Sequence, residues 1–197
     1  MNRQYQTAAA LLLAFCLGSC SNPQATEPTQ LARDSFFPLA VGNVWYYSSY
    51  SYGTMADTSK FDERKEVISH KYLGNKDFYL LFDSYYNTDG SVRAIDSLYY
   101  SLYDDTLLII HANTPFTDSS ISLARIFPPT ASDSFRFGDG YEGSLVSQSD
   151  SIVVYSFWKP DWMDSGWNET YKKNIGMIDT HSGWGIGSML VKYYLKH

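Results

Sequence analysis

Residues 78–91 read FYLLFDSYYNTDGS, and this stretch decides the fold of the chain. A strand places alternate residues on opposite faces of its sheet. In FYLLF the even positions carry Phe, Leu and Phe, and the odd positions carry Tyr and Leu, so both faces are apolar. The Asp89-Gly90 pair that follows is the favoured chemistry of a type I′ hairpin turn. The stretch therefore predicts a strand that is buried on both sides and that returns as an antiparallel neighbour.

A second stretch, LLIIHA at residues 107–112, has the same two-faced apolar pattern. Covering the second face would ordinarily require helices, but no window of 11 or more residues shows a convincing helical stripe. Only residues 31–37 and 121–127 could each supply a short turn of helix. The sheet must therefore fold over itself, which predicts an all-β domain built as a barrel, a half-barrel or a sandwich.

The remaining strand signals are short aromatic or β-branched runs separated by turn residues. They predict about nine or ten mostly antiparallel strands, at residues 44–52, 61–73, 78–87, 92–103, 107–112, 134–137, 143–148, 152–158, 170–179 and 188–196. The 17 tyrosines and the aromatic content of 17% fit this pattern, because aromatic side chains favour strands. The formal net charge is −6, and Lys and Arg form only isolated pairs. A nucleic-acid partner is not expected, since phosphate binding needs several clustered cations.

Both cysteines lie near the start of the chain, in LLLAFCLGSCSNPQ at residues 11–24. A disulfide between Cys16 and Cys20 would constrain no later part of the fold, and a metal site would lack its other ligands. Arg3, an apolar run over residues 8–17 and small residues after it follow the order of a secretory signal. The apolar run is too short to span a bilayer, which takes about 20 residues.

The motif Leu17-Gly18-Ser19-Cys20 resembles the lipobox of bacterial lipoproteins. The resemblance implies that Cys20 is joined to diacylglycerol after cleavage before it, and that the acyl chains anchor the protein to the membrane. An ordinary cleaved signal with a coincidental cysteine is the alternative. The implied organisation is a signal peptide at residues 1–19, a flexible tether at 20–34 and one β domain at 35–197. Ser21 is not Asp, so we expect the outer rather than the inner membrane of the cell envelope; the side of the membrane is left open.

The opening of the domain, FFPLAVGNVWYY at residues 36–47, resembles the FPL-x-x-G-N-x-W-x-Y opening of a group of uncharacterised bacterial lipoproteins. Many of these end in an aromatic strand as here, where residues 171–195 read YKKNIGMIDTHSGWGIGSMLVKYYL. The resemblance implies a β-rich extracytoplasmic domain and no particular activity. Residues 127–135 echo residues 37–45, either by duplication or independently. We expect Trp45 and Phe135, at matching positions, to point into the core.

No catalytic, metal or cofactor site is predicted. The GDGYEG motif at residues 138–143 lies between strands, whereas a dinucleotide site needs a following helix. Ser156 and Lys159 match S-x-x-K, but in a strand they would face opposite sides. The histidines His70, His111, His181 and His197 are scattered, which favours structural roles.

The candidate binding residues are tryptophans in turn-rich segments, namely Trp158, Trp162, Trp167 and Trp184. They could stack on a ligand at a barrel mouth, or plug that end of the barrel with their own rings. The sequence favours a lipid-anchored, non-catalytic domain that binds an apolar or glycan ligand. An accessory protein-interaction module of an envelope assembly is the alternative, and an enzyme ranks third.

Overall fold

The computed structural model describes residues 35–103, 106–115, 117, 120–126, 134–137, 140–162 and 165–196. Within these residues, twelve strands form one antiparallel sheet, which confirms the all-β class. None of the described segments is a helix long and apolar enough to cross a membrane. The strands are β1 Val44–Tyr50, β2 Glu63–Leu73, β3 Lys76–Tyr86, β4 Val92–Tyr103, β5 Thr106–His111, β6 Ser122–Ile126, β7 Ser134–Phe137, β8 Tyr141–Gln148, β9 Ile152–Trp158, β10 Trp167–Lys172, β11 Gly176–Ser182 and β12 Gly187–Tyr194.

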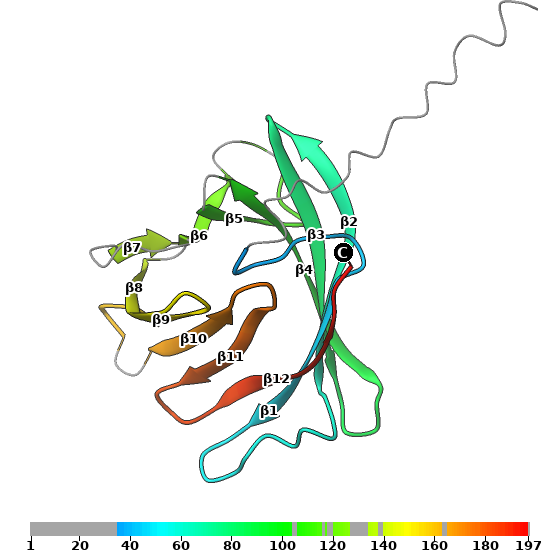
Figure 1. Cartoon of the computed structure of the whole chain (residues 1–197), viewed down its shortest axis with the longest axis vertical. Coiled ribbons are helices and arrows are strands. Elements are labelled where there is room, and N and C mark those ends of the chain that lie inside the picture. Colours follow the sequence, from blue (N-terminus) through cyan, green and yellow to red (C-terminus); the bar gives the residue numbers. More distant parts are fainter. Residues whose placement is uncertain are drawn as a thin grey trace, which may run out of the picture.

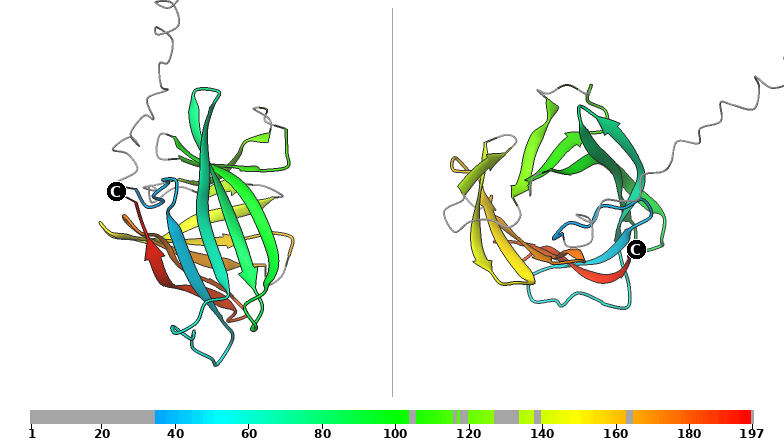
Figure 2. Two further views of the ribbon diagram at one scale, coloured as in Figure 1. Left: turned by 90° about the vertical axis from the view of Figure 1, so that its right-hand side faces the viewer. Right: turned by 45° about the horizontal axis from the view of Figure 1, so that its top comes forward.

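The strand order explains how the sheet encloses an interior. It runs β6-β5-β4-β3-β2-β1-β12-β11-β10-β9-β8-β7, so β1 and β12 join the two halves of the chain in the middle. The sheet curls from this seam, with long β2, β3 and β4 on one side and β8 to β12 on the other (Figure 1). β6 and β7 are the two edges, so the sheet is a half-barrel open between them (Figure 2).

The concave face of the sheet carries the main core. Buried side chains from both halves meet there, including Trp45 and Tyr47 of β1, Leu81 of β3 and Tyr155 of β9. Leu81 belongs to the odd-numbered face of the FYLLF stretch, and Phe78 on the opposite face is also fully buried. Leu80 and Phe82, on the same face as Phe78, are half-buried, so the second face of β3 is covered in part.

The segment before β1 packs against the core, where Phe36 and Leu39 are buried. Gly42 has a φ of 91°, which suits glycine, and the amide of Asn43 donates to the carbonyl of Ala40 in this turn at 3.0 Å. The buried Asn43 side chain donates to Pro38 O at 3.1 Å and accepts from the amide of Lys196 at 2.8 Å. The Gly-Asn pair of the FPL-x-x-G-N-x-W-x-Y opening thus ties this segment to the C-terminal end of the domain.

Trp45 lies in the core as predicted, and it is 3% exposed. Its indole Nε1 donates to Ile175 O at 2.5 Å across the interior. The matching residue Phe135 lies on β7, but its side chain is outside the described part of the structure. The expectation that both residues point into the core is therefore confirmed for Trp45 and stays a prediction for Phe135.

Two local predictions differ from the structure. Residues 170–179, expected as one strand, contain the end of β10, a turn and the start of β11. Asn174 makes this turn with a φ of 62°, a conformation that asparagine tolerates better than most residues, and this signal was missed. Residues 121–127, expected as a turn of helix, contain strand β6 instead, because pairing with β5 satisfies its backbone. Together these changes raise the strand count to twelve. Of residues 31–37, the described part forms a bend.

Candidate functional site: a cavity inside the half-barrel

The concave face does not fill its interior completely. A cavity of about 350 Å³ remains between β1 to β6 on one side and β10 and β11 on the other. Its walls are mostly apolar and come from segments far apart in the sequence. They include Phe37, Leu107, Ile109, Leu123 and Met177. This volume lies within the range of about 300–1,000 Å³ that is usual for small-molecule sites.

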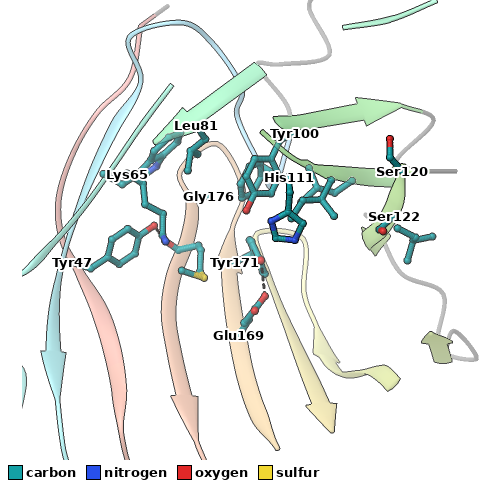
Figure 3. A pocket seen from close by; sticks show the side chains of 16 residues that line it. Tyr47, Lys65, Leu81, Tyr100, His111, Ser120, Ser122, Glu169, Tyr171 and Gly176 are labelled. Atoms are coloured by element: carbon teal, nitrogen blue, oxygen red, sulfur yellow. Dashed lines mark hydrogen bonds between the residues drawn. The ribbon is translucent and has the colours of Figure 1, made fainter. Parts of the chain in front are cut away.

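The cavity has a deep end and an open end. Trp45, Tyr47 and Leu81 line the deep end and are nearly inaccessible to solvent. His111, at the end of β5, is exposed, and Ser122 of β6 is half-buried. In Figure 3, Tyr47 and Lys65 lie at one side of the cavity and Ser120 and Ser122 at the other. A ligand would therefore enter beside the edge strand β6.

Aromatic rings form one wall of the cavity. Phe37, from the segment before β1, packs against Tyr100 with ring centroids 5.2 Å apart and against Tyr171 at 6.2 Å. Tyr155 contacts Tyr171 edge to face at 6.1 Å. Such tilted pairs fix the ring positions and leave flat apolar surfaces toward the cavity.

A buried ion triad lies beside the deep end. The ammonium of Lys65 on β2 pairs with the carboxylates of Glu63 and Asp83, whose strands β2 and β3 are neighbours. Ser188 donates to Glu63 Oε2 at 3.2 Å, and Tyr85 donates to Asp83 Oδ2 at 3.0 Å. Asp83 Oδ1 is buried and has no hydrogen-bond partner among the described residues. The charge of Lys65 is thus what chiefly balances two buried acids.

The triad determines which protonation states are available. Burial disfavours the Lys65 ammonium, but the Glu63 and Asp83 carboxylates outweigh this and hold the pKa of Lys65 well above its usual value. Burial raises the pKa of Glu63, and the attraction of Lys65 offsets only part of that effect. Lys65 therefore stays charged at neutral pH and is unsuited to act as a nucleophile or a base.

A second buried acid lines the floor of the cavity. Glu169 of β10 accepts hydrogen bonds from Trp167 Nε1 at 2.9 Å and from the Tyr171 hydroxyl at 2.6 Å. Across the cavity, the Tyr47 hydroxyl donates to Met177 O at 3.0 Å, and burial raises the pKa of Tyr47. These contacts fix the orientation of polar side chains in the cavity wall. In the part of the chain that the structure describes, no three His, Cys, Asp or Glu side chains gather to hold a metal ion.

The four candidate tryptophans lie near the β9–β10 and β11–β12 connections, and none of them lines the cavity. Trp167 faces the interior and stacks on Phe157, with centroids 5.0 Å apart. Trp158 is half-buried at the end of β9. Trp162 and Trp184 are 62% and 63% exposed. Cys20 lies outside the described residues.

The cavity residues were missed by the sequence analysis. They are spread over eight strands and two connecting segments, and those on strands are ordinary inward-facing residues. One signal was available: Glu63 and Lys65 occupy the inward positions of β2, where Val67 follows in the core. Charged residues that alternate into a core face point to a polar group in the interior.

Comparison with known proteins supports the fold. The chain matches no protein-family model and no curated protein. A candidate lipoprotein from Parabacteroides distasonis has a similar structure, with a TM-score of 0.52 and 11% identity over 82% of this chain and 99% of that one. A candidate exported protein with a YmcC-like fold from Bacteroides fragilis gives a TM-score of 0.51 and 12% identity over 82% and 100%. At this level of identity the likeness shows a shared fold, and the half-barrel is therefore an architecture that solved bacterial proteins also use.

Proposed function

We propose that this chain is a lipid-anchored lipoprotein of the bacterial cell envelope whose domain binds an apolar ligand in the interior cavity without chemically changing it. The cavity of about 350 Å³ is the observation that carries the proposal. Protein interiors ordinarily pack closely and leave no void as large as this one. An apolar space with an open end and a few fixed polar groups is the usual form of a small-molecule site.

The anchor is supported by the sequence and by the structural neighbours. The lipobox-like motif ends at Cys20. Residues 20–34 would connect a lipid on Cys20 to the domain, whose first described residue is Ser35. The backbone carbonyl of Ser35 accepts a hydrogen bond from Asn174 at 2.8 Å. The tether would thus leave the domain close to Phe37, which lines the cavity. The names of both neighbours, a lipoprotein and an exported protein, fit an envelope location, and the absence of Asp at residue 21 favours the outer membrane.

Titration with N-phenyl-1-naphthylamine, a neutral apolar dye, tests the cavity. Its fluorescence should rise on binding to the domain expressed from residue 20 with Cys20→Ser. Leu123→Trp should abolish most of this rise, because Leu123 lines the cavity near its open end and the larger side chain would obstruct that end. Leu123 lies on the edge strand β6, where a larger side chain can be accommodated with least disturbance of the core.

Val146→Trp is the matched control, because Val146 on β8 is exposed and lies outside the cavity. It adds the same indole and should leave dye binding unchanged. Equal dye binding by the wild type and Leu123→Trp would contradict the proposal, as would the absence of binding to the wild type.

An outward aromatic cluster favours a second candidate, an accessory module that binds another envelope protein. Tyr46 contacts Phe61 at 4.7 Å and Tyr194 at 6.1 Å, and Phe61 contacts Tyr86 at 5.6 Å, all between ring centroids. Phe61 and Tyr194 are exposed. If this candidate is correct, cross-linking in whole cells should show a specific protein adduct that is lost in Phe61→Ser and kept in Leu123→Trp. If the cavity alone holds the function, no adduct that depends on Phe61 should form.

A further inference from the structure

A second groove, with polar side chains on its floor, lies on the convex face of the sheet, separate from the cavity. Its volume is about 510 Å³, and it is bounded by the loop after β1 and the β11–β12 turn, with strands β9, β10 and β11 as its floor. Asn168 faces this groove, whereas its neighbour Glu169 faces the cavity, because alternate residues of β10 point to opposite sides. The two spaces are thus on opposite faces of one strand.

The floor of the groove is a row of polar side chains across neighbouring strands. Asn168 of β10 pairs in register with Ser156 of β9 and with His181 of β11. His181 pairs in register with Gly187 of β12, which pairs with Tyr50 of β1. The absence of a side chain at Gly187 lets the Tyr50 ring cross β12, since a Cβ there would lie 2.5 Å from the Tyr50 hydroxyl.

Hydrogen bonds fix the orientation of this row. Asp179 Oδ1 accepts from the Tyr50 hydroxyl at 3.1 Å, and Asp179 Oδ2 accepts from His181 Nδ1 at 3.1 Å. His181 Nε2 therefore carries the lone pair and accepts from Asn168 Nδ2 at 3.2 Å. The Asn168 amide keeps its carbonyl oxygen and one N–H for a ligand, and the Ser156 hydroxyl lies on the next strand.

Exposed aromatic rings border the groove. Tyr52 lines it and is 87% exposed, and its ring packs against the backbone at Gly185. Trp184, also exposed, lies between Gly183 and Gly185, both of which line the groove. An open ring beside fixed amide and hydroxyl groups suits a ligand with an apolar C–H face and a polar edge.

The charge of the groove narrows the ligand class. The described residues that line it include no lysine or arginine, so a phosphate or carboxylate would find no cation there. The Asp179 carboxylate is engaged by Tyr50 and His181, which leaves neutral donors and acceptors facing the groove. From these features we propose that the groove is a neutral saccharide-binding site, in which Asn168 and Ser156 bind sugar hydroxyls and the Tyr52 ring stacks on a pyranose face.

Saturation-transfer NMR tests the proposal with four neutral probes, maltotriose, cellotriose, mannotriose and chitotriose. At least one should receive saturation from the wild-type domain at millimolar concentration. Asn168→Ala should weaken its binding by about threefold to tenfold, as expected for one lost hydrogen bond. Tyr52→Ala should weaken binding at least as much, because the stacking surface is removed.

Asn113→Ala and Tyr72→Ala are matched controls, since both residues are exposed and lie outside the groove. They should bind the probe as the wild type does. Dye binding in the cavity should be unchanged in Asn168→Ala, which separates this site from the proposed function and shows that the variant is folded. The proposal is overturned if none of the four probes receives saturation, or if the controls weaken binding as much as Asn168→Ala and Tyr52→Ala.

Discussion

Removing the charge of Lys65 tests the assignment of the buried triad most directly. In Lys65→Met the carboxylates of Glu63 and Asp83 would remain beside each other, and both residues are only 7% exposed. Breaking a buried ion pair by removing one partner costs about 3–5 kcal/mol, because the other charge is left uncompensated. We expect a loss of this size in the free energy of unfolding at neutral pH.

The loss should also depend on pH. Burial already raises the pKa of Glu63 above its ordinary value of 4.5, and Lys65 is the main group that lowers it. Without Lys65 the folded-state pKa rises further. A carboxyl whose pKa is higher in the folded state adds stability below its unfolded pKa and loses that contribution as the pH rises through the folded pKa. The penalty of Lys65→Met should therefore be smaller at about pH 5 than at about pH 8.

Urea unfolding followed by tryptophan fluorescence at both pH values measures the effect. Arg64→Met is the control, because the adjacent Arg64 faces outward and pairs with Glu66, with both side chains about a quarter exposed to solvent. Such a pair contributes about 0–1 kcal/mol. The triple variant with Glu63→Gln and Asp83→Asn should recover much of the loss. A penalty for Lys65→Met below about 1 kcal/mol, or one that is larger at the lower pH, would refute the reasoning.

Three further changes follow from the same structure. Trp45→Ala should lower the free energy of unfolding by about 3–5 kcal/mol in the same urea assay, because it removes a large buried side chain from the core. A loss below about 1 kcal/mol would contradict the placement of Trp45 in the core. Gly176→Ala should lower the free energy of unfolding by about 1–3 kcal/mol, since its φ is 104° and a Cβ would lie 3.3 Å from Trp45 Nε1. Gly183→Ala is the control, because the space around Gly183 is open, and it should lower this free energy by less than about 0.5 kcal/mol. Equal losses in the two variants would contradict backbone strain at Gly176. Cys20→Ser should release the protein from membranes on cell fractionation while Cys16→Ser should not, and retention of both variants would exclude lipidation at Cys20.

Residues 78–82 and 107–112 were enough to predict a folded-over sheet. Their apolar residues occupy both faces, and a chain without helical periodicity has only another part of the sheet with which to cover them. The boundaries of β4, β7 and β9 were predicted correctly because turn residues or alternation mark both ends. The β10–β11 turn was missed because its three residues Lys173, Asn174 and Ile175 lack the Gly or Pro that usually marks such turns.

The sequence by itself determined the class of the fold, the acidic character of the chain and the motif at Cys20, because each depends on residues that are close together in the chain. Only the tertiary structure decided where a ligand could bind. The cavity joins Phe37, Leu123 and Met177, and the convex groove joins Tyr52, Ser156 and His181. These residues meet because strand register and sheet curvature bring them together, and both arise from pairing between segments distant in sequence, which local patterns do not encode.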